Sequence, residues 1–300
     1  MKNIFTAILF LLAVTAFAQD SLTTVKTDTT SFDYGMRIYD TRIGRSASVD
    51  PKASQQNNPY QFEQQKTVSD SLTGEFTFEF NNQQYDAIII NPKMQQIKMH
   101  WLSPNNTPYK SLSSVKEDLE KQENKVLMLT NGGMYLENNQ PQGLFISKGK
   151  ELNSLDTDSN KYGNFYMKPN GVFYIDNKGG NITTTNIFKR IYNKENNSIS
   201  FATQSGPMLV INGNIHQKFM PQSKNLHLRS GVGIMSNGNV VFIISRSNKT
   251  NFHDFGSIFK DVFDCQNALY LDGAISKMYL PKLRPNDLGG NFGVIISITE

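Results

Sequence analysis

Short apolar runs, each closed by a turn signal, constrain the fold of this chain more than any other feature. The turn signals are glycine and asparagine groups, as in Pro169-Asn170-Gly171, Asn212-Gly213-Asn214 and Asn237-Gly238-Asn239. Glycine and asparagine tolerate the positive φ angles of tight turns, and short apolar runs between such turns are typical of β-strands. The spacing therefore predicts a sheet in which most neighbouring strands are antiparallel.

Three segments depart from this pattern and predict helices. Ser114 and Glu117 form a capping box at the start of the first, which extends to about Glu123. The second covers residues 186–192, and Asn251 is expected to cap the third, in which phenylalanines recur at helical spacing. The predicted fold class is α+β, with a mixed, largely antiparallel twisted β-sheet flanked by a few helices.

The third helix lies between two apolar strands, Val240–Ser245 and Ala268–Leu271. A right-handed crossover through a helix gives two strands that point the same way in one sheet. We therefore expect Asp272, which follows the second strand, at the same sheet edge as the end of the first. Three antiparallel strands are expected at the start of the domain, at 76–80, 85–90 and 97–102, and further strands at 143–147, 163–167, 172–175, 201–204, 208–211 and 289–298.

The N-terminal residues predict export. Residues 1–18 combine a lysine, an apolar run and the pattern Ala16-Phe17-Ala18, which is typical of a secretory signal peptide. Residues 19–72 are so polar that we expect a flexible arm, with a small ordered island near Tyr34. The domain is expected at 73–300. The mature chain, cut near Ala18, would then be periplasmic or secreted and have no membrane span.

Composition excludes several classes of protein. The single cysteine, Cys265, allows no intrachain disulfide, so a hydrophobic core must supply the stability. The formal net charge of +4 falls to +3 without Lys2, and the charges are well mixed, so no nucleic-acid partner is indicated. Zinc-protease, nucleotide-loop and lipase signatures are absent. No cofactor is predicted and no metal site is assigned, although a divalent cation held by Asp272 and backbone oxygens is left open.

Three strand ends carry side chains suited to chemistry, and each also has a purely structural interpretation. Asp272-Gly273 presents a carboxylate beside a residue free to take positive φ, or forms a hairpin turn. Asn131-Gly132-Gly133 offers backbone amides to an anion, or forms an ordinary loop. Arg229 lies among apolar and small residues, where an arginine binds a phosphate or carboxylate, or forms a structural ion pair.

Five motifs, taken together and in order, resemble the phosphodiester glycosidase family. The family includes the uncovering enzyme, which removes N-acetylglucosamine from a sugar phosphodiester, and this chain is similar to a branch of bacterial exported proteins. The resemblance covers about residues 75–299. The motifs are Asn131-Gly132-Gly133-Met134-Tyr135, Pro141-Gln142-Gly143-Leu144, Gln204-Ser205-Gly206-Pro207, Arg229-Ser230-Gly231-Val232-Gly233 and Leu271-Asp272-Gly273-Ala274-Ile275-Ser276.

The resemblance implies an exported hydrolase that cleaves the sugar–phosphate bond of a sugar phosphodiester or phosphorylated polysaccharide. Asp272 would be the nucleophile, the general base or the stabiliser of an oxocarbenium-like transition state, and Arg229 would bind the phosphate. Asn131 would be the third catalytic residue. The nearest candidates for a second carboxylate are Glu137 and Asp254, so the stereochemical outcome stays open. The substrate-binding residues implied are Gly132, Gly133, Gln204, Ser205, Ser230, Gly273 and Ser276.

Two alternatives remain. Ala274 and Ile275 follow Gly273 where many family members have glycine or serine, which favours a catalytically inactive phosphoglycan-binding module of the cell envelope. A transferase that passes a sugar phosphate to an acceptor other than water is the weaker alternative.

Overall fold

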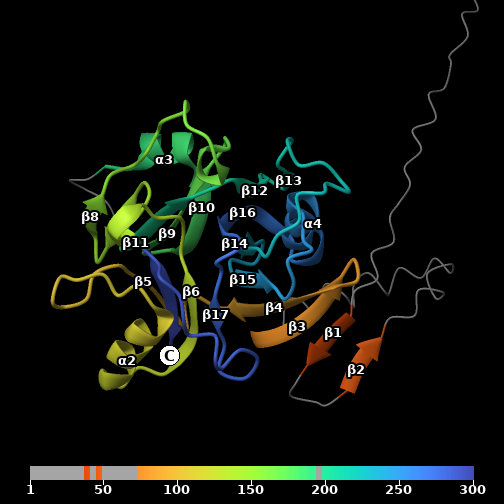
Figure 1. The fold of residues 1–300 in the computed structure, drawn as a ribbon, viewed down its shortest axis with the longest axis horizontal. Helices are drawn as coiled ribbons and strands as arrows, with labels where there is room; N and C mark the ends of the chain where they lie inside the picture. The colour runs from red at the N-terminus through yellow and green to blue at the C-terminus, as the bar shows by residue number, and fades with distance from the viewer. Residues whose placement is uncertain (1–36, 41–44, 49–72, 194–197) are drawn as a thin grey trace, which may run out of the picture. The chain divides into compact units, whose positions relative to one another are not determined.

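Three antiparallel sheets and three short α-helices make up the described part of the chain (Figure 1). The computed structural model describes residues 37–40, 45–48, 73–193 and 198–300, which lie within one unit, Tyr34–Glu300. The predicted signal peptide and most of the predicted arm lie outside the described residues, so both stay predictions. Among the described residues, no helix is long and apolar enough to cross a membrane.

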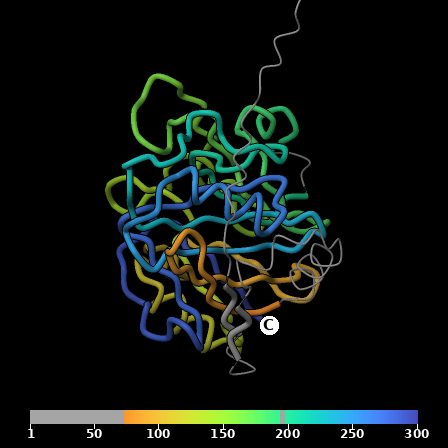
Figure 2. The backbone as a smooth tube through the Cα atoms, turned by 90° about the vertical axis from the view of Figure 1, so that its right-hand side faces the viewer, coloured from red at the N-terminus to blue at the C-terminus, as the bar shows by residue number. Residues whose placement is uncertain are grey.

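The largest sheet has nine strands. They are β1 (Arg37–Asp40), β2 (Arg45–Ser48), β3 (Gly74–Phe80), β4 (Gln83–Ile90), β12 (Met208–Ile211), β13 (Asn214–Ile215), β14 (Ser230–Met235), β15 (Val240–Ser245) and β16 (Cys265–Asp272). Their order is β13-β12-β16-β14-β15-β4-β3-β1-β2. β1 lies in the island expected near Tyr34 and pairs with β3. β4 and β15, far apart in sequence, run side by side, in orange and light blue in Figure 2.

Two smaller sheets complete the fold. The five-stranded sheet has the order β10-β9-β11-β7-β8 and the four-stranded sheet the order β17-β6-β18-β5. Their strands are β5 (Gln96–His100), β6 (Val126–Asn131), β7 (Phe145–Ser147), β8 (Lys150–Asn153), β9 (Gly171–Asp176), β10 (Gly179–Thr184), β11 (Phe201–Ser205), β17 (Met278–Tyr279) and β18 (Ile295–Thr299). The α+β class is confirmed, with the strands divided among three sheets rather than collected in one.

The predicted parallel direction of the strands on either side of the third helix is confirmed. β14 pairs antiparallel with both β15 and β16, so β15 and β16 point the same way with β14 between them. Ser230 pairs with Ile244 on one side and with Asp272 on the other, which puts Asp272 at the edge where β15 ends, as expected.

Three local predictions need correction. β5 does not join β3 and β4 but pairs with β18, because its apolar side chains pack between the sheets instead of extending the hairpin. Residues 163–167 form a 3₁₀ turn, η3 (Asn164–Tyr166), rather than a strand. The first helix, α2 (Leu112–Lys121), begins earlier than its capping box suggests, because the Ser111 side chain accepts the backbone N–H of Ser114.

The other two helices follow the sequence more closely. α3 (Thr185–Ile191) begins one residue before its predicted start and packs Phe188 against the five-stranded sheet. α4 (Phe252–Ser257) is capped by Asn251 as predicted, and it continues into a π-helical turn, η4 (Ile258–Val262).

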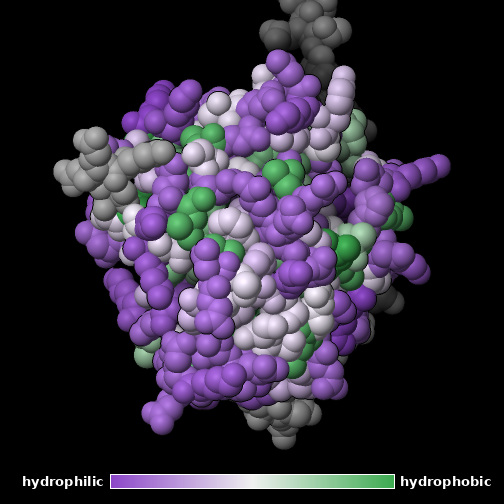
Figure 3. Space-filling model, turned by 60° about the vertical axis from the view of Figure 1, so that its left-hand side comes forward, coloured by the Kyte–Doolittle hydropathy of each residue, from purple (hydrophilic) through white to green (hydrophobic). Residues whose placement is uncertain are grey.

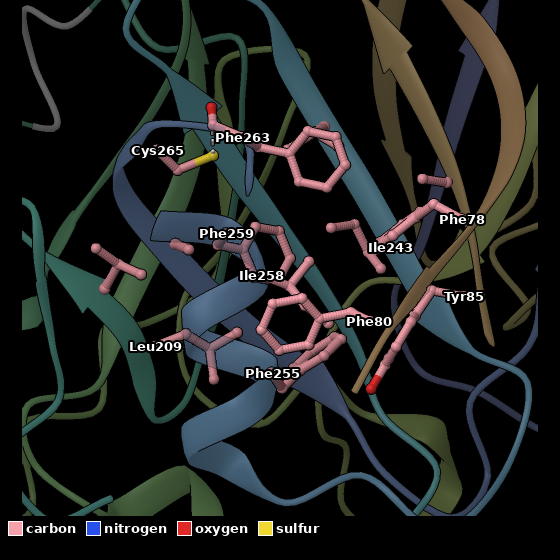
Figure 4. Packing of buried hydrophobic residues seen from close by; sticks show 14 of the residues in the cluster. Phe78, Phe80, Tyr85, Leu209, Ile243, Phe255, Ile258, Phe259, Phe263 and Cys265 are labelled. Carbon is pink, nitrogen blue, oxygen red and sulfur yellow. Dashed lines mark hydrogen bonds between the residues drawn. The ribbon is translucent and has the colours of Figure 1, made fainter. Parts of the chain in front are cut away.

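The apolar side chains gather inside the protein, and the face drawn in Figure 3 is mostly hydrophilic with small separate hydrophobic groups. The hydrophobic core has two main layers. α4, η4 and their phenylalanines cover one face of the nine-stranded sheet (Figure 4). Gly231 and Gly233 make this packing close, since a Cβ atom on Gly233 would lie 2.6 Å from the Phe259 ring. The opposite face packs its isoleucines, valines and leucines against both smaller sheets. The site described next lies where the nine-stranded and four-stranded sheets meet.

Candidate active site

Asp272 ends β16 and begins the connection to the four-stranded sheet. β16 pairs with β12 and β14, whereas β17, which follows, pairs with β6. Asp272-Gly273 is therefore not the turn of a hairpin between β16 and β17. The structure thus excludes the structural interpretation that the sequence left open for this dipeptide.

Neutral donors hold the Asp272 carboxylate. Asn131, the last residue of β6, donates from Nδ2 to Oδ2 of Asp272 at 2.9 Å, and the backbone N–H of Gly273 donates to Oδ1 at 2.7 Å. No ion pair is found for this carboxylate in the described part of the chain. The described residues thus stabilise the charge on Asp272 through two hydrogen bonds from neutral groups.

The pKa of Asp272 is raised to about 6. Burial is the main cause, because removing water disfavours the charged carboxylate, while the bonds from Gly273 and Asn131 act in the opposite direction. A carboxyl group with this pKa exchanges its proton close to neutral pH, as general acids and bases of enzymes do.

The loop after β6 offers one backbone donor to an anion. The N–H of Gly132 donates to the carbonyl of Val294 at 2.8 Å, so this amide cannot also bind an anion, contrary to our expectation for it. The N–H of Gly133 has no hydrogen-bond partner among the described residues, and the Gly133 φ angle of 151° is one that glycine adopts readily. Of the two predicted amides, Gly133 alone is available.

Tyr135 also lies near Asp272, although the sequence analysis gave this residue of the first motif no role in the site. Burial, and then the charge of Asp272, raises the pKa of its hydroxyl, so the phenol lies within electrostatic reach of the carboxylate. Its place in the Asn131–Tyr135 motif was the signal available in the sequence. A phenol in this position can donate a hydrogen bond to a substrate oxygen.

The predicted serines surround Asp272 but bond to the protein. The hydroxyl groups of Ser230 and Ser276 lie 2.8 Å apart, and both residues are buried. Ser205 donates to the carbonyl of Leu271 at 3.1 Å. These three residues therefore fix the end of β16 and the loop that follows it.

Gln204 uses its whole hydrogen-bonding capacity inside the protein. Its Oε1 accepts the N–H groups of Leu144 and Asp156, and its Nε2 donates to the Asp156 carbonyl and to Thr185. A primary amide can accept two hydrogen bonds and donate two, so no side-chain group is left for a ligand. The Gln204 side chain therefore holds the segments of Leu144, Asp156 and Thr185 together.

Arg229 is fully buried and stacks on an aromatic ring. Its guanidinium carbon lies 3.6 Å from the centre of the Phe252 ring. Nε donates to the carbonyl of Thr250 and Nη2 to Asn225, whereas Nη1 is buried without a hydrogen-bond partner. No carboxylate pairs with Arg229 in the described part of the chain, so its positive charge is uncompensated.

Arg229 and Asp272 face opposite sides of the nine-stranded sheet. Arg229 packs on α4, whereas Asp272 contacts Asn131 of the four-stranded sheet. A β-bulge separates them: Ser230 pairs with Asp272 but Gly231 pairs with Tyr270, which leaves Leu271 as an extra residue. Because strand residues alternate between faces, the bulge turns Asp272 away from Tyr270 and Arg229.

The structure does not bring the candidate second carboxylates to Asp272. Glu137 lies in an exposed turn, and Asp254 accepts a hydrogen bond from Asn251 at the start of α4. In the described residues, no group of three or more His, Cys, Asp or Glu side chains could hold a metal ion.

A polar hollow of about 630 Å³ borders the loop after β6. Gln142, which donates its backbone N–H to the carbonyl of Met134, forms part of the lining. Tyr166 supplies an aromatic face and donates its hydroxyl to Asp156 at 3.0 Å. This volume is within the usual range for small-molecule sites. Neither Asp272 nor Asn131 lines the hollow, so it adjoins the carboxylate only through the loop after β6.

A family model describes residues 124–292 as a phosphodiester glycosidase domain. The chain is also 39% identical over 194 residues to YigE, an uncharacterized protein of Escherichia coli K12, covering 65% of this chain and 73% of that protein. The family match spans more than half of the sequence and includes Asn131, Arg229 and Asp272. The chain belongs to the phosphodiester glycosidase family.

A solved structure shows the same fold. It is the catalytic domain of zebrafish N-acetylglucosamine-1-phosphodiester α-N-acetylglucosaminidase, auto-inhibited by its pro-peptide. The alignment has a TM-score of 0.51 and 13% identity, and covers 91% of this chain and 85% of that one. At this identity the likeness concerns the fold, while family membership supports a hydrolase.

Proposed function

We propose that this protein hydrolyses the sugar–phosphate bond of glycan phosphodiesters, with Asp272 as the reacting carboxylate. The observation that carries this proposal is a partly buried carboxylate at a strand end, which has no cationic partner among the described residues and a pKa raised to about 6. Ionised, it can act as nucleophile or base; protonated, it can return the proton. The leaving phosphate monoester needs charge stabilisation more than a strong acid.

We propose two donors of that stabilisation. The N–H of Gly133, two residues after Asn131 in the chain, has no hydrogen-bond partner among the described residues and can bind a phosphate oxygen. Arg229 acts through its uncompensated charge from the other face of β14, since charge is poorly screened in a protein interior. The polar hollow holds the glycan part of the substrate, with Tyr166 as a stacking face.

The test is product release from a panel of sugar-1-phosphodiesters by the wild type and Asp272→Asn, with and without a chelator. Release by the wild type alone supports the proposal; equal release by both proteins contradicts it. Arg229→Lys keeps the charge and should retain more activity than Arg229→Met. Gln142→Ala should raise KM a few-fold for donors with an extended glycan and leave short donors unaffected.

A phosphoglycan-binding module is the second candidate. The observation that favours it is the loop after Gly273, where exposed Ala274 and Ile275 bring no polar side chain to the site. This candidate predicts binding of phosphoglycans that Arg229→Met weakens, with no product from any donor. Export is proposed from residues 1–18 alone, and sequencing of the mature N-terminus would test it.

A further inference from the structure

The dipeptide Lys277-Met278 links Asn131 to a network of ion pairs. It follows the Asp272 loop and leads into β17. The N–H of Lys277 donates to Oδ1 of Asn131 at 3.0 Å, and its carbonyl accepts from Thr130 at 2.8 Å. The N–H of Met278 donates to Asp287 at 3.2 Å, and its carbonyl accepts from Arg284 Nε at 3.2 Å. Side chains therefore bind all four backbone polar groups.

Asp287 is the centre of this network. Its Oδ1 lies 2.8 Å from Lys277 Nζ, and its Oδ2 accepts from Nη2 and Nε of Arg284 at 2.6 and 3.1 Å. Burial raises the pKa of Asp287, but Lys277 and Arg284 outweigh it and hold that pKa below its usual value. Asp287 is thus charged and bound on both oxygens.

Arg284 anchors the network in the nine-stranded sheet. Its Nη1 lies 3.1 Å from Oδ2 of Asp86, a fully buried residue of β4. Asp86 also accepts from Thr77 and from Arg246. The dipeptide is consequently fixed relative to β6 on one side and to β4 on the other.

We propose that Asp287, together with Arg284, is a positioning residue that orients the Asn131 amide toward Asp272. The Lys277 N–H is a donor, so of the two ends of the Asn131 amide it can bond only to the oxygen. The NH2 group of the amide then points to the Asp272 carboxylate. A reversed amide would aim its oxygen at the carboxylate and lose both bonds. The expected effect on turnover rests on the proposed role of Asp272. The orientation of the Asn131 amide does not depend on that role.

The electrostatic surroundings make the effect measurable at Asp272. The titratable groups on which Asp272 acts are Tyr135 and Tyr270, whose raised pKa values keep both phenols neutral at the pH of interest. The Lys277 ammonium faces Asp287. Loosening the dipeptide weakens the Asn131 bond, which opposes the effect of burial, so the pKa of Asp272 should rise further.

The experiment follows the Asn131 side-chain ¹⁵N amide signal against pH in full-length wild type and Asp287→Asn. We expect the midpoint to move up by about 0.5 pH unit, and kcat on any active donor to fall about tenfold with KM within about twofold. Asp118→Asn is the control, because Asp118 also accepts a side-chain bond, from Tyr109, but lies on α2. It should leave the midpoint and kcat unchanged.

An unchanged midpoint in Asp287→Asn would overturn the proposal, as would an equal shift in Asp118→Asn. If Asp287→Asn does not fold, Arg284→Lys replaces it: this variant keeps the charge but loses the fork, and a smaller upward shift is expected. If the wild type releases no product while the Asp287→Asn midpoint still moves, the positioning role stands and the proposed hydrolase activity fails.

Discussion

Asp86 and Asp272 are both aspartates at the nine-stranded sheet, but their surroundings differ. Asp86 is fully buried and meets two arginines, Arg246 and Arg284, at 2.7 and 3.1 Å. Within the described ranges, Asp272 accepts hydrogen bonds from just one amide side chain and one backbone N–H. The comparison shows that burial alone does not distinguish the proposed catalytic carboxylate from a structural one. A carboxylate paired with arginines holds the sheets together, whereas a carboxyl group without a cationic partner can keep its proton to higher pH.

The largest expected effect is on turnover. Asp272→Asn should lower kcat by about a thousandfold, since an amide can be neither nucleophile nor base. The thermal transition should not fall, because no charged partner is stranded. Steady-state kinetics measures kcat and calorimetry measures the thermal transition. A stable variant with wild-type kcat would contradict the proposed catalytic role of Asp272.

The same substitution at Asp86 should act on stability. Asp86→Asn leaves two arginines without a counter-charge, and breaking a buried pair in this way costs about 3 kcal/mol of the free energy of unfolding. Urea denaturation measures the loss. If Asp86→Asn is as stable as the wild type, the division into a structural and a functional carboxylate fails.

The pH dependence of stability sharpens the difference further. The folded-state pKa of Asp272, about 6, exceeds the ordinary value of 3.8, so the native state holds the proton more tightly and wild-type stability falls as pH rises from 4 to 6. Asp272→Asn lacks this loss. Above pH 6 it should exceed the wild type by about 1–2 kcal/mol, a difference reduced by the partial exposure of Asp272 and absent below pH 4. Denaturation curves at pH 4 and pH 8 compare the two proteins, and equal differences at both would contradict the assignment.

The smallest expected change in the free energy of unfolding comes from an exposed carboxylate. Glu300 forms an ion pair with Lys125 at 2.7 Å, and both side chains are at least half exposed. Glu300→Gln should change the free energy of unfolding by less than about 0.5 kcal/mol, because water and salt screen such pairs. A larger loss in the same denaturation assay would mean that exposure is a poor guide to the value of these charges.

Local sequence signals predicted much of the fold. The Asn251 cap, the β15–α4–β16 crossover and the position of Asp272 at a strand end all depend on residues close together in the chain. The partner of β5 could not be predicted, because the apolar pattern of a strand does not specify which other strand it pairs with. The division into three sheets was missed for the same reason.

The arrangement of the predicted site residues could not be read from the sequence. Regular alternation along β16 would put Asp272 on the face of Tyr270 and Arg229, and one extra residue, Leu271, reverses this. Gln204 and Gly132 were expected to contact substrate, but their polar groups bond to Asp156 and Val294, which are distant in sequence. A sequence motif does not show which of its polar groups form hydrogen bonds within the folded protein.

The four-stranded sheet also determines when the site can exist during synthesis. β6, which carries Asn131, lies between β17 and β18, so both of its neighbours come from residues made long after it. A growing chain therefore holds β6 with both edges unpaired, open to aggregation, until residues 278–299 have emerged. The two side chains at the centre of the proposed chemistry, Asn131 and Asp272, can therefore be fixed against each other only after nearly the whole domain has been made.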